Sequence, residues 1–429
     1  MLKGGKNCTI TYLRMIKAVS RLDLRFILLA TVCIFPILKF NVISIVIILF
    51  SLISIIIFFT QKEKLNSFFV KHFFLNSILF FLLLISLAYS YNFDFGLNKL
   101  QQVLSLMVFP LIIFFLNIKI DQKRLNILLW VFTATCLLLT AYIYTELISS
   151  GAFTALLNND IKFWNNPFRE VLYSLKYVQL HPSYYSIWIC FSALFLTQDV
   201  FKQEKLYTII IRVLLVLILV FTALLFSSRG PLLGFFVAFI IVLLSLFKSS
   251  SKKLLFLALV FTVIGVSVTQ MSFLKSRFID EFSAQEFRPP VGNAHTSTNI
   301  RVGIYTCVLQ IFNNNKFIGV GIGDVQNELD SCYQQFHTKV YEESNYNTHS
   351  SYFNILLATG TIGLIMFLVV WFYQFKLAYN SENKLYLGFL ILIAVSMLFE
   401  NILIRMHGAV FYALFNSIFV KNLFINKSS

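Results

Sequence analysis

The chain has 429 residues, of which 58% are hydrophobic, 17% aromatic and only 13% charged. A soluble domain carries about twice that fraction of charge, so the composition excludes an ordinary soluble protein. The formal net charge of +16 would suggest nucleic acid as a partner of a soluble protein, but here the basic residues are scattered between apolar runs. We therefore expect an integral membrane protein that binds no nucleic acid.

Long, continuously apolar runs divide the chain. A hydrocarbon core of about 30 Å needs about 20 apolar residues per helix, and these runs lack the short alternation of barrel strands. They predict a single integral-membrane domain over residues 1–429, all-α and polytopic, with about twelve transmembrane helices. The expected spans are residues 24–40, 42–60, 68–90, 99–117, 125–149, 182–199, 207–226, 230–247, 253–271, 352–375, 384–400 and 407–422.

Lysine and arginine are concentrated in alternate connections between these spans. Because cytoplasmic loops carry an excess of both residues, this set of connections is expected to be cytoplasmic, together with both termini. The connections of the other set then face outward. They include two long segments, 150–181 and 272–351, and the second of these separates the ninth and tenth spans.

The first outward segment and the short link before residue 230 carry several candidate residues. Arg169 and His181 lie within or at the end of segment 150–181, and Arg229 is the only charge between two apolar spans. An arginine near the hydrocarbon boundary is usually paired or functional, although a side chain that only reaches toward the interface is an open alternative. Pro231 suits the first turn of the next helix, whose N–H groups would favour an anion beside Arg229.

The outward segment 272–351 carries the most unusual pattern in the chain. Arg301 opens a run with apolar positions at helical spacing through Phe312, which predicts an amphipathic helix on the outer membrane face. The glycines of the run 319–323 permit unusual backbone conformations but make only a weak motif, without the strand that precedes a nucleotide loop. His349 immediately precedes the tenth span, where a histidine could take a proton or simply form a structural hydrogen bond.

Three further features complete the set of candidates. Glu400 and Arg405 flank a turn before the last span, either as a mutual ion pair or as functional groups. Cys307 and Cys332 share the long segment, but the sequence does not favour a disulfide between them. The outward segments contain no cluster of metal-ligand type, so we expect neither a metal nor another cofactor.

Several separated segments resemble the O-antigen ligase and polymerase superfamily, which are integral-membrane transferases that act on glycans linked to undecaprenyl diphosphate. The matching segments are Ser228-Arg229-Gly230, Arg301 before its amphipathic run, the glycine run 319–323, and Thr348-His349-Ser350-Ser351-Tyr352 with Thr359-Gly360-Thr361-Ile362-Gly363-Leu364. His181-Pro182-Ser183-Tyr184 and residues 400–408 are similar to patterns in some branches. Ser350 departs from the family, in which asparagine usually follows the histidine.

The resemblance implies a fold like that of C-type glycosyltransferases, with segment 272–351 capping a cavity at the membrane surface. It implies that Arg229 and Arg301 bind the diphosphate and that His349 is the catalytic base. Arg169, His181, Glu400 and Arg405 are accessory candidates. The reaction would be metal-independent and inverting, on the periplasmic face of the bacterial cytoplasmic membrane, in lipopolysaccharide or other polysaccharide biosynthesis.

The acceptor stays open between a lipid A core sugar, another lipid-linked repeat unit and a protein side chain. We slightly favour a ligase that uses the lipid A core over a polymerase or a protein O-glycosyl ligase. An alternative of another class is a polytopic transporter or flippase, but no repeat of two related halves is visible in the sequence.

Overall fold

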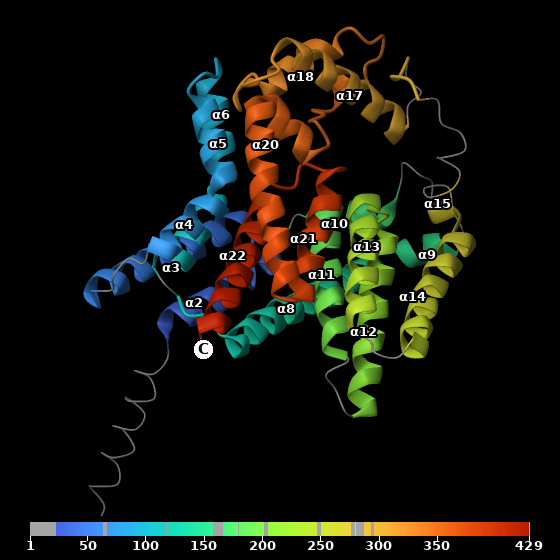
Figure 1. Ribbon diagram of the computed structural model, residues 1–429. Helices are drawn as coiled ribbons and strands as arrows, with labels where there is room; N and C mark the ends of the chain where they lie inside the picture. Colours follow the sequence, from blue (N-terminus) through green and yellow to red (C-terminus); the bar gives the residue numbers. More distant parts are fainter. Residues whose placement is uncertain are drawn as a thin grey trace, which may run out of the picture.

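The computed structural model describes residues 23–62, 67–116, 118–157, 166–178, 180–200, 205–246, 250–275, 279, 287–292 and 296–428. The elements within these ranges are helical (Figure 1). They are α2 (Leu24–Val32), η1 (Phe35–Ile37), α3 (Phe40–Thr60), α4 (Ser67–Asn76), α5 (Ile78–Leu87), α6 (Phe93–Gln102), α7 (Ser105–Pro110), η2 (Leu111–Phe115), α8 (Gln122–Ser149), α9 (Ala152–Leu157), α10 (Pro167–Ser174), α11 (Pro182–Val200), α12 (Leu206–Leu225), α13 (Arg229–Leu246), α14 (Ser250–Gln270), α15 (Ser272–Lys275), α17 (Ser297–Asn314), α18 (Val325–Tyr333), α19 (Val340–Glu343), α20 (Ser351–Asn380), α21 (Lys384–Met397) and α22 (Met406–Ser428).

Several of these helices are built to cross a membrane. Among the described residues, 5 helices are long and apolar enough to do so, or up to 7 if two bent pairs each count as one span. The exposed faces are apolar as well, for example at Ile45, Ile56 and Phe59 of α3 and at Val369 and Phe372 of α20. Such surfaces suit lipid rather than water. The protein is therefore a polytopic helical membrane protein, while the count of twelve spans stays a prediction.

Two of the predicted spans are sharply bent pairs of helices. The segment predicted at 68–90 is the pair α4 and α5, bent by 60°, and the segment predicted at 99–117 belongs to α6 and α7 with η2, bent by 47°. The second bend has a simple cause, since α6 contains Asp94, Lys99 and Gln102 and is too polar to continue in line with the apolar helix that follows. The bend carries α6 toward the end of the molecule where α17 and α18 lie (Figure 1).

The central bundle positions the rest of the chain. Helix α13 packs against α21 and α11, and α11 also contacts α12, α8 and α21. Helices α17 and α18 lie across one end of this bundle, and the C-terminus lies at the other end (Figure 1). The amphipathic helix predicted from Arg301 is α17, and its C-cap is Asn315. A Cys307–Cys332 disulfide ties α17 to α18, a pairing that the sequence did not favour.

The glycine run 319–323 inserts into a break in α20. Gly360 interrupts that helix with a φ of 67°, which frees backbone groups on both sides. The carbonyls of Leu357 and Ala358 accept hydrogen bonds of 2.7 and 3.2 Å from the N–H groups of Val320 and Gly321. Beyond the break, the N–H groups of Thr361 and Ile362 donate to the carbonyls of Lys316 and Phe317. The buried backbone groups at the break are thus satisfied by the loop.

Glycine is required on both sides of this contact. A Cβ on Gly319 would lie against the Leu357 carbonyl, and a Cβ on Gly360 would lie against the Phe317 carbonyl. The loop then continues to Asp324, whose carboxylate accepts hydrogen bonds of 2.7 and 2.9 Å from the N–H groups of Tyr91 and Asn92. The glycine run and Asp324 therefore fasten the connection between α17 and α18 to α20 and to the turn before α6.

We predict that Gly360→Ala destabilises the protein. The conformation of Gly360, with a φ of 67° and a ψ of −171°, is essentially restricted to glycine and costs a residue with a Cβ about 1–3 kcal/mol, and the collision with the Phe317 carbonyl adds to this cost. Thermal unfolding in detergent should show a clear loss of Tm. Gly265→Ala in α14 is the matched control, because a Cβ there meets nothing within 4 Å. Equal Tm values for the two variants would contradict the role assigned to Gly360.

Candidate functional site

The site centres on Glu400, in the turn that follows α21. The span predicted to end at residue 400 ends at Met397, so the carboxylate lies beyond the helix. Glu400 Oε1 accepts a hydrogen bond of 3.2 Å from the Ser183 hydroxyl and lies 3.9 Å from the Arg301 guanidinium. Its Oε2 lies 3.8 Å from His349 Nδ1. One carboxylate thus contacts side chains of three segments that are distant in the sequence.

The charges around Glu400 keep it ionised. Burial alone would raise the pKa of this carboxyl, but His349, His181 and Arg301 outweigh burial and hold the pKa at about 2. For His181 the effect of burial prevails. Burial and the nearby arginines lower its pKa to about 4 despite the attraction of Glu400. His181 is therefore neutral near pH 7, and its Nδ1 accepts a hydrogen bond of 3.2 Å from the Ser183 N–H.

A cavity of about 610 Å³ opens beside Glu400, and we call it the arginine cavity. Its polar lining includes Arg169, Arg229, Arg301 and Glu400. Its apolar lining comes mainly from helices α13 and α14, with Leu233, Phe236, Ile264 and Val268. The cavity therefore combines three cationic side chains with a wall suited to a hydrocarbon chain.

Local packing sets the positions of these arginines. Arg229 begins α13, and the next residue, Gly230, lies so close to Phe399 that a Cβ would collide with that ring. The Arg301 guanidinium carbon lies 6.0 Å from the centre of the same ring, within cation–π range. Arg169 Nη1 donates a hydrogen bond of 2.9 Å to the Phe226 carbonyl at the end of α12. Phe399 thus contacts both the start of α13, next to Arg229, and the Arg301 side chain of α17.

His349 is held in an unusual conformation beside Glu400. Its φ of 44° is uncommon for a residue with a Cβ and has to be supported by its surroundings. Its N–H donates to Asn347 Oδ1 at 2.9 Å, and the following Ser350 caps α20. Ser351 then donates to the Glu400 carbonyl from its N–H at 3.2 Å and from its hydroxyl at 3.0 Å. The backbone on either side of the imidazole is therefore fixed.

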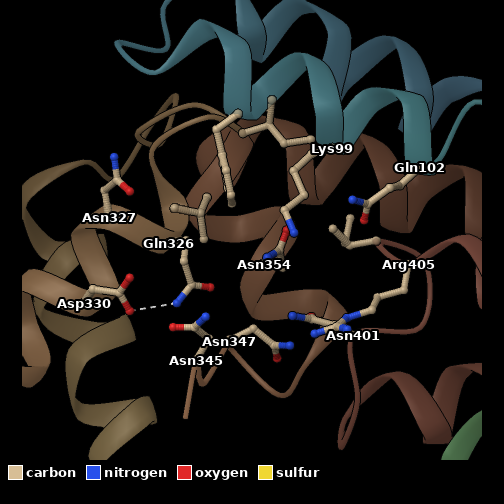
Figure 2. Close-up of a pocket in the computed structure, with 14 residues that line it drawn as sticks. Lys99, Gln102, Gln326, Asn327, Asp330, Asn345, Asn347, Asn354, Asn401 and Arg405 are labelled. Carbon is tan, nitrogen blue, oxygen red and sulfur yellow. Dashed lines mark hydrogen bonds between the residues drawn. The ribbon is translucent and has the colours of Figure 1, made fainter. Parts of the chain in front are cut away.

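A second cavity, of about 540 Å³, lies between α6, α18 and the start of α20, and we call it the amide cavity. Figure 2 shows the side chains of Lys99 and Arg405 turned toward it from opposite elements, with Lys99 pointing toward Asn354. Seven side-chain amides line this cavity: Gln102, Gln326, Asn327, Asn345, Asn347, Asn354 and Asn401. Glu400 and Asn401 are consecutive but line different cavities, and His349 contacts both Glu400 and Asn347. His349 thus lies at the partition between the two cavities.

The structure brings most of the sequence candidates together. Arg169, Arg229, Arg301 and Glu400 line the arginine cavity, while His349 and His181 lie beside Glu400. Arg405 instead lines the amide cavity. The mutual ion pair that we considered for Glu400 and Arg405 does not form within the described part of the chain, because Glu400 turns toward Arg301 and His349.

Sequence reasoning missed several residues of the site. Ser183 follows His181 in a motif that we noted, but nothing in the motif indicates a hydrogen bond to a residue 217 positions away. Phe399 looks like the end of an apolar span, and Lys99 looks like a charge at the edge of another. The only signal for Lys99 was its place in a run too polar for a membrane helix.

The fold and the cavities together define a polytopic helical membrane protein with a cation-lined, partly apolar cavity at one end of its bundle. Residues 214–368 match the family model described as O-antigen ligase. This segment therefore belongs to the O-antigen ligase superfamily, as the sequence motifs predict. It includes Arg229, Arg301 and His349 and ends before Glu400. No curated protein matches the chain.

We predict that Glu400 stabilises the folded protein in a pH-dependent way. Folding lowers the pKa of this carboxyl from 4.5 to about 2. The stabilisation is therefore complete well above pH 4.5 and is lost as the pH falls toward 2. Glu400→Gln should lower Tm at pH 7, and its deficit relative to the parent protein should shrink as the pH drops from 5 to 3.

Thermal unfolding in detergent across this pH range checks the prediction. Glu342→Gln is the control, because Glu342 is exposed on α19. A Tm deficit of Glu400→Gln that stays constant from pH 7 to pH 3 would be inconsistent with the proposed charge interactions.

Proposed function

We propose that this protein transfers a saccharide from undecaprenyl diphosphate to an acceptor hydroxyl, with a lipid A core sugar as the favoured acceptor. Members of the matched family are glycosyltransferase-like ligases that act on lipid-linked glycans in general. The observation that supports undecaprenyl diphosphate as the donor is the arginine cavity, in which cationic and apolar walls meet. A diphosphate joined to a polyprenyl chain has the same division between an anionic head and an apolar tail.

The arginines suit the anionic head of this donor. A guanidinium stays charged and can grip two phosphate oxygens with parallel N–H groups. Arg229 lines the cavity from the start of α13, Arg301 lines it from the second turn of α17, and Arg169 adds a third cation. The polyprenyl chain would leave along Leu233, Phe236, Ile264 and Val268, on the side of the cavity formed by α13 and α14.

The proposed step is an inverting displacement without a metal. The acceptor hydroxyl oxygen forms a bond to the anomeric carbon, and the bond from that carbon to the diphosphate oxygen breaks. The hydroxyl proton goes to His349, and the electron pair leaves with undecaprenyl diphosphate, whose added charge the arginines stabilise. Glu400 faces His349 Nδ1, so Nε2 is the nitrogen available to take the proton.

We also propose that the site lies on the periplasmic side of the bacterial cytoplasmic membrane, with both termini in the cytoplasm. The distribution of lysine and arginine supports this orientation. The Cys307–Cys332 disulfide supports it too, because such bonds persist in oxidising compartments. Strong activity of alkaline phosphatase fused to the C-terminus would rule out this orientation.

The central prediction concerns His349. His349→Ala should lower kcat by a factor of about 10² or more, because proton transfer by a positioned base contributes about 10²–10⁴. The assay uses purified protein in nanodiscs, an undecaprenyl-diphosphate-linked glycan, a lipid A core acceptor and no added metal. His337→Ala is the matched control, since His337 is an exposed histidine of the same outward segment. Unchanged turnover in well-folded His349→Ala protein would sink the assignment.

A second prediction concerns the diphosphate. Arg229→Lys and Arg301→Lys should each lower kcat/KM about tenfold, because lysine keeps the charge but loses the bidentate geometry. Arg212→Lys serves as the control, since Arg212 pairs with Asp199 away from the arginine cavity. Parent-like rates in the protein with lysine at both positions would contradict the proposed binding of the diphosphate by Arg229 and Arg301.

A further inference from the structure

The amide cavity has the chemistry of a glycan site. A side-chain amide both donates and accepts hydrogen bonds, as a sugar hydroxyl does, so a lining with seven amides can match several hydroxyls. Asn354 gives the clearest indication of an absent ligand. It is only 8% exposed, it lines the cavity, and its Oδ1 is a buried acceptor without a hydrogen-bond partner. A buried acceptor of this kind is costly unless a ligand or water satisfies it.

Two cations accompany these amides. Lys99 reaches the cavity from α6, and Arg405 reaches it from the turn before α22. Within the described part of the chain, neither side chain has an acidic partner within 4.0 Å. Asp330 also lines the cavity, and its carboxylate accepts a hydrogen bond of 2.8 Å from Gln326. The side of the cavity with Lys99 and Arg405 is therefore positively charged.

The two cavities suit different substrates of the proposed transfer. Only a few apolar side chains line the amide cavity, and it lacks the row of aliphatic residues that follows the arginines in the other cavity. A polyprenyl donor therefore fits the arginine cavity better. A polar ligand in the amide cavity would approach the partition that holds His349 from the side of Asn347.

We propose that the amide cavity binds the acceptor glycan and that Lys99 and Arg405 select an acceptor with an anionic substituent. The inference rests on the proposed transferase function. The anionic group is a carboxylate, as in a uronic acid, or a phosphate on a sugar. Lys99 and Arg405 bind this group, and the amides bind the hydroxyls of the neighbouring sugar rings.

The test measures binding first, without any donor, so that it does not depend on transfer. Purified full-length protein in detergent is titrated with cellobiose, cellobiouronic acid and cellobiose 6′-phosphate. We expect the parent protein to bind at least one anionic disaccharide about tenfold or more tightly than cellobiose, as charge-assisted hydrogen bonds would give. The two anionic probes distinguish a carboxylate from a phosphate as the preferred group.

The variants identify the cavity. Lys99→Gln together with Arg405→Gln should bring the affinity for the anionic probe close to that for cellobiose. Asn354→Leu should weaken the binding of all three disaccharides, and its Tm reports whether it folds. Lys339→Gln is the matched control, because Lys339 is an exposed lysine of the same outward segment that lines neither cavity.

Three outcomes would overturn the inference. They are equal affinity of the parent protein for all three probes, an anionic preference that survives the double substitution, and pyrophosphate binding that is tighter than the anionic disaccharides and depends on Lys99 and Arg405. Transfer is then measured separately with the lipid-linked donor. Selective binding with no transfer to any acceptor would refute the proposed function and leave the binding site standing.

Discussion

The arrangement of the site depends on the compensation of one negative charge. A carboxylate removed from water is stable only where cations and hydrogen-bond donors surround it. For the Glu400 carboxylate these are the Arg301 guanidinium at 3.9 Å and the Ser183 hydroxyl, while His349 Nδ1 lies 3.8 Å away and Ser351 donates twice to the backbone carbonyl of Glu400. The same contacts join α11, α17, α20 and the turn after α21, so the requirement to satisfy Glu400 also brings the candidate catalytic groups together.

A second constraint fixes the segment between Arg301 and His349. A helix broken at Gly360 exposes carbonyls and N–H groups that have to be paired, and the glycine run pairs them. The segment between Arg301 and His349 is fastened at this break, at Asp324 and by the Cys307–Cys332 disulfide. Arg301 of this segment lines one cavity, and Gln326 lines the other.

The sequence predicted the membrane class, the family and the amphipathic helix at Arg301, because periodicity, composition and motifs report on these directly. From the sequence, Glu400 was only an accessory candidate. Its contact with Ser183 joins residues 217 positions apart, and no local sequence pattern indicates it. The break at Gly360 was missed for a related reason, since an apolar run shows that a helix is buried but not that a loop enters it. Lys99 and the amides of the second cavity lie on separate segments, and only folding brings them together.

We propose that the arginine cavity holds the diphosphate of a lipid-linked donor next to His349. The most direct test is a cryo-electron microscopy structure of the protein with an undecaprenyl-diphosphate-linked glycan in nanodiscs. Diphosphate density is expected between Arg229 and Arg301, with lipid density along Phe236 and Ile264 and the first sugar directed toward His349. Diphosphate density in the amide cavity, beside Lys99 and Arg405, would contradict it.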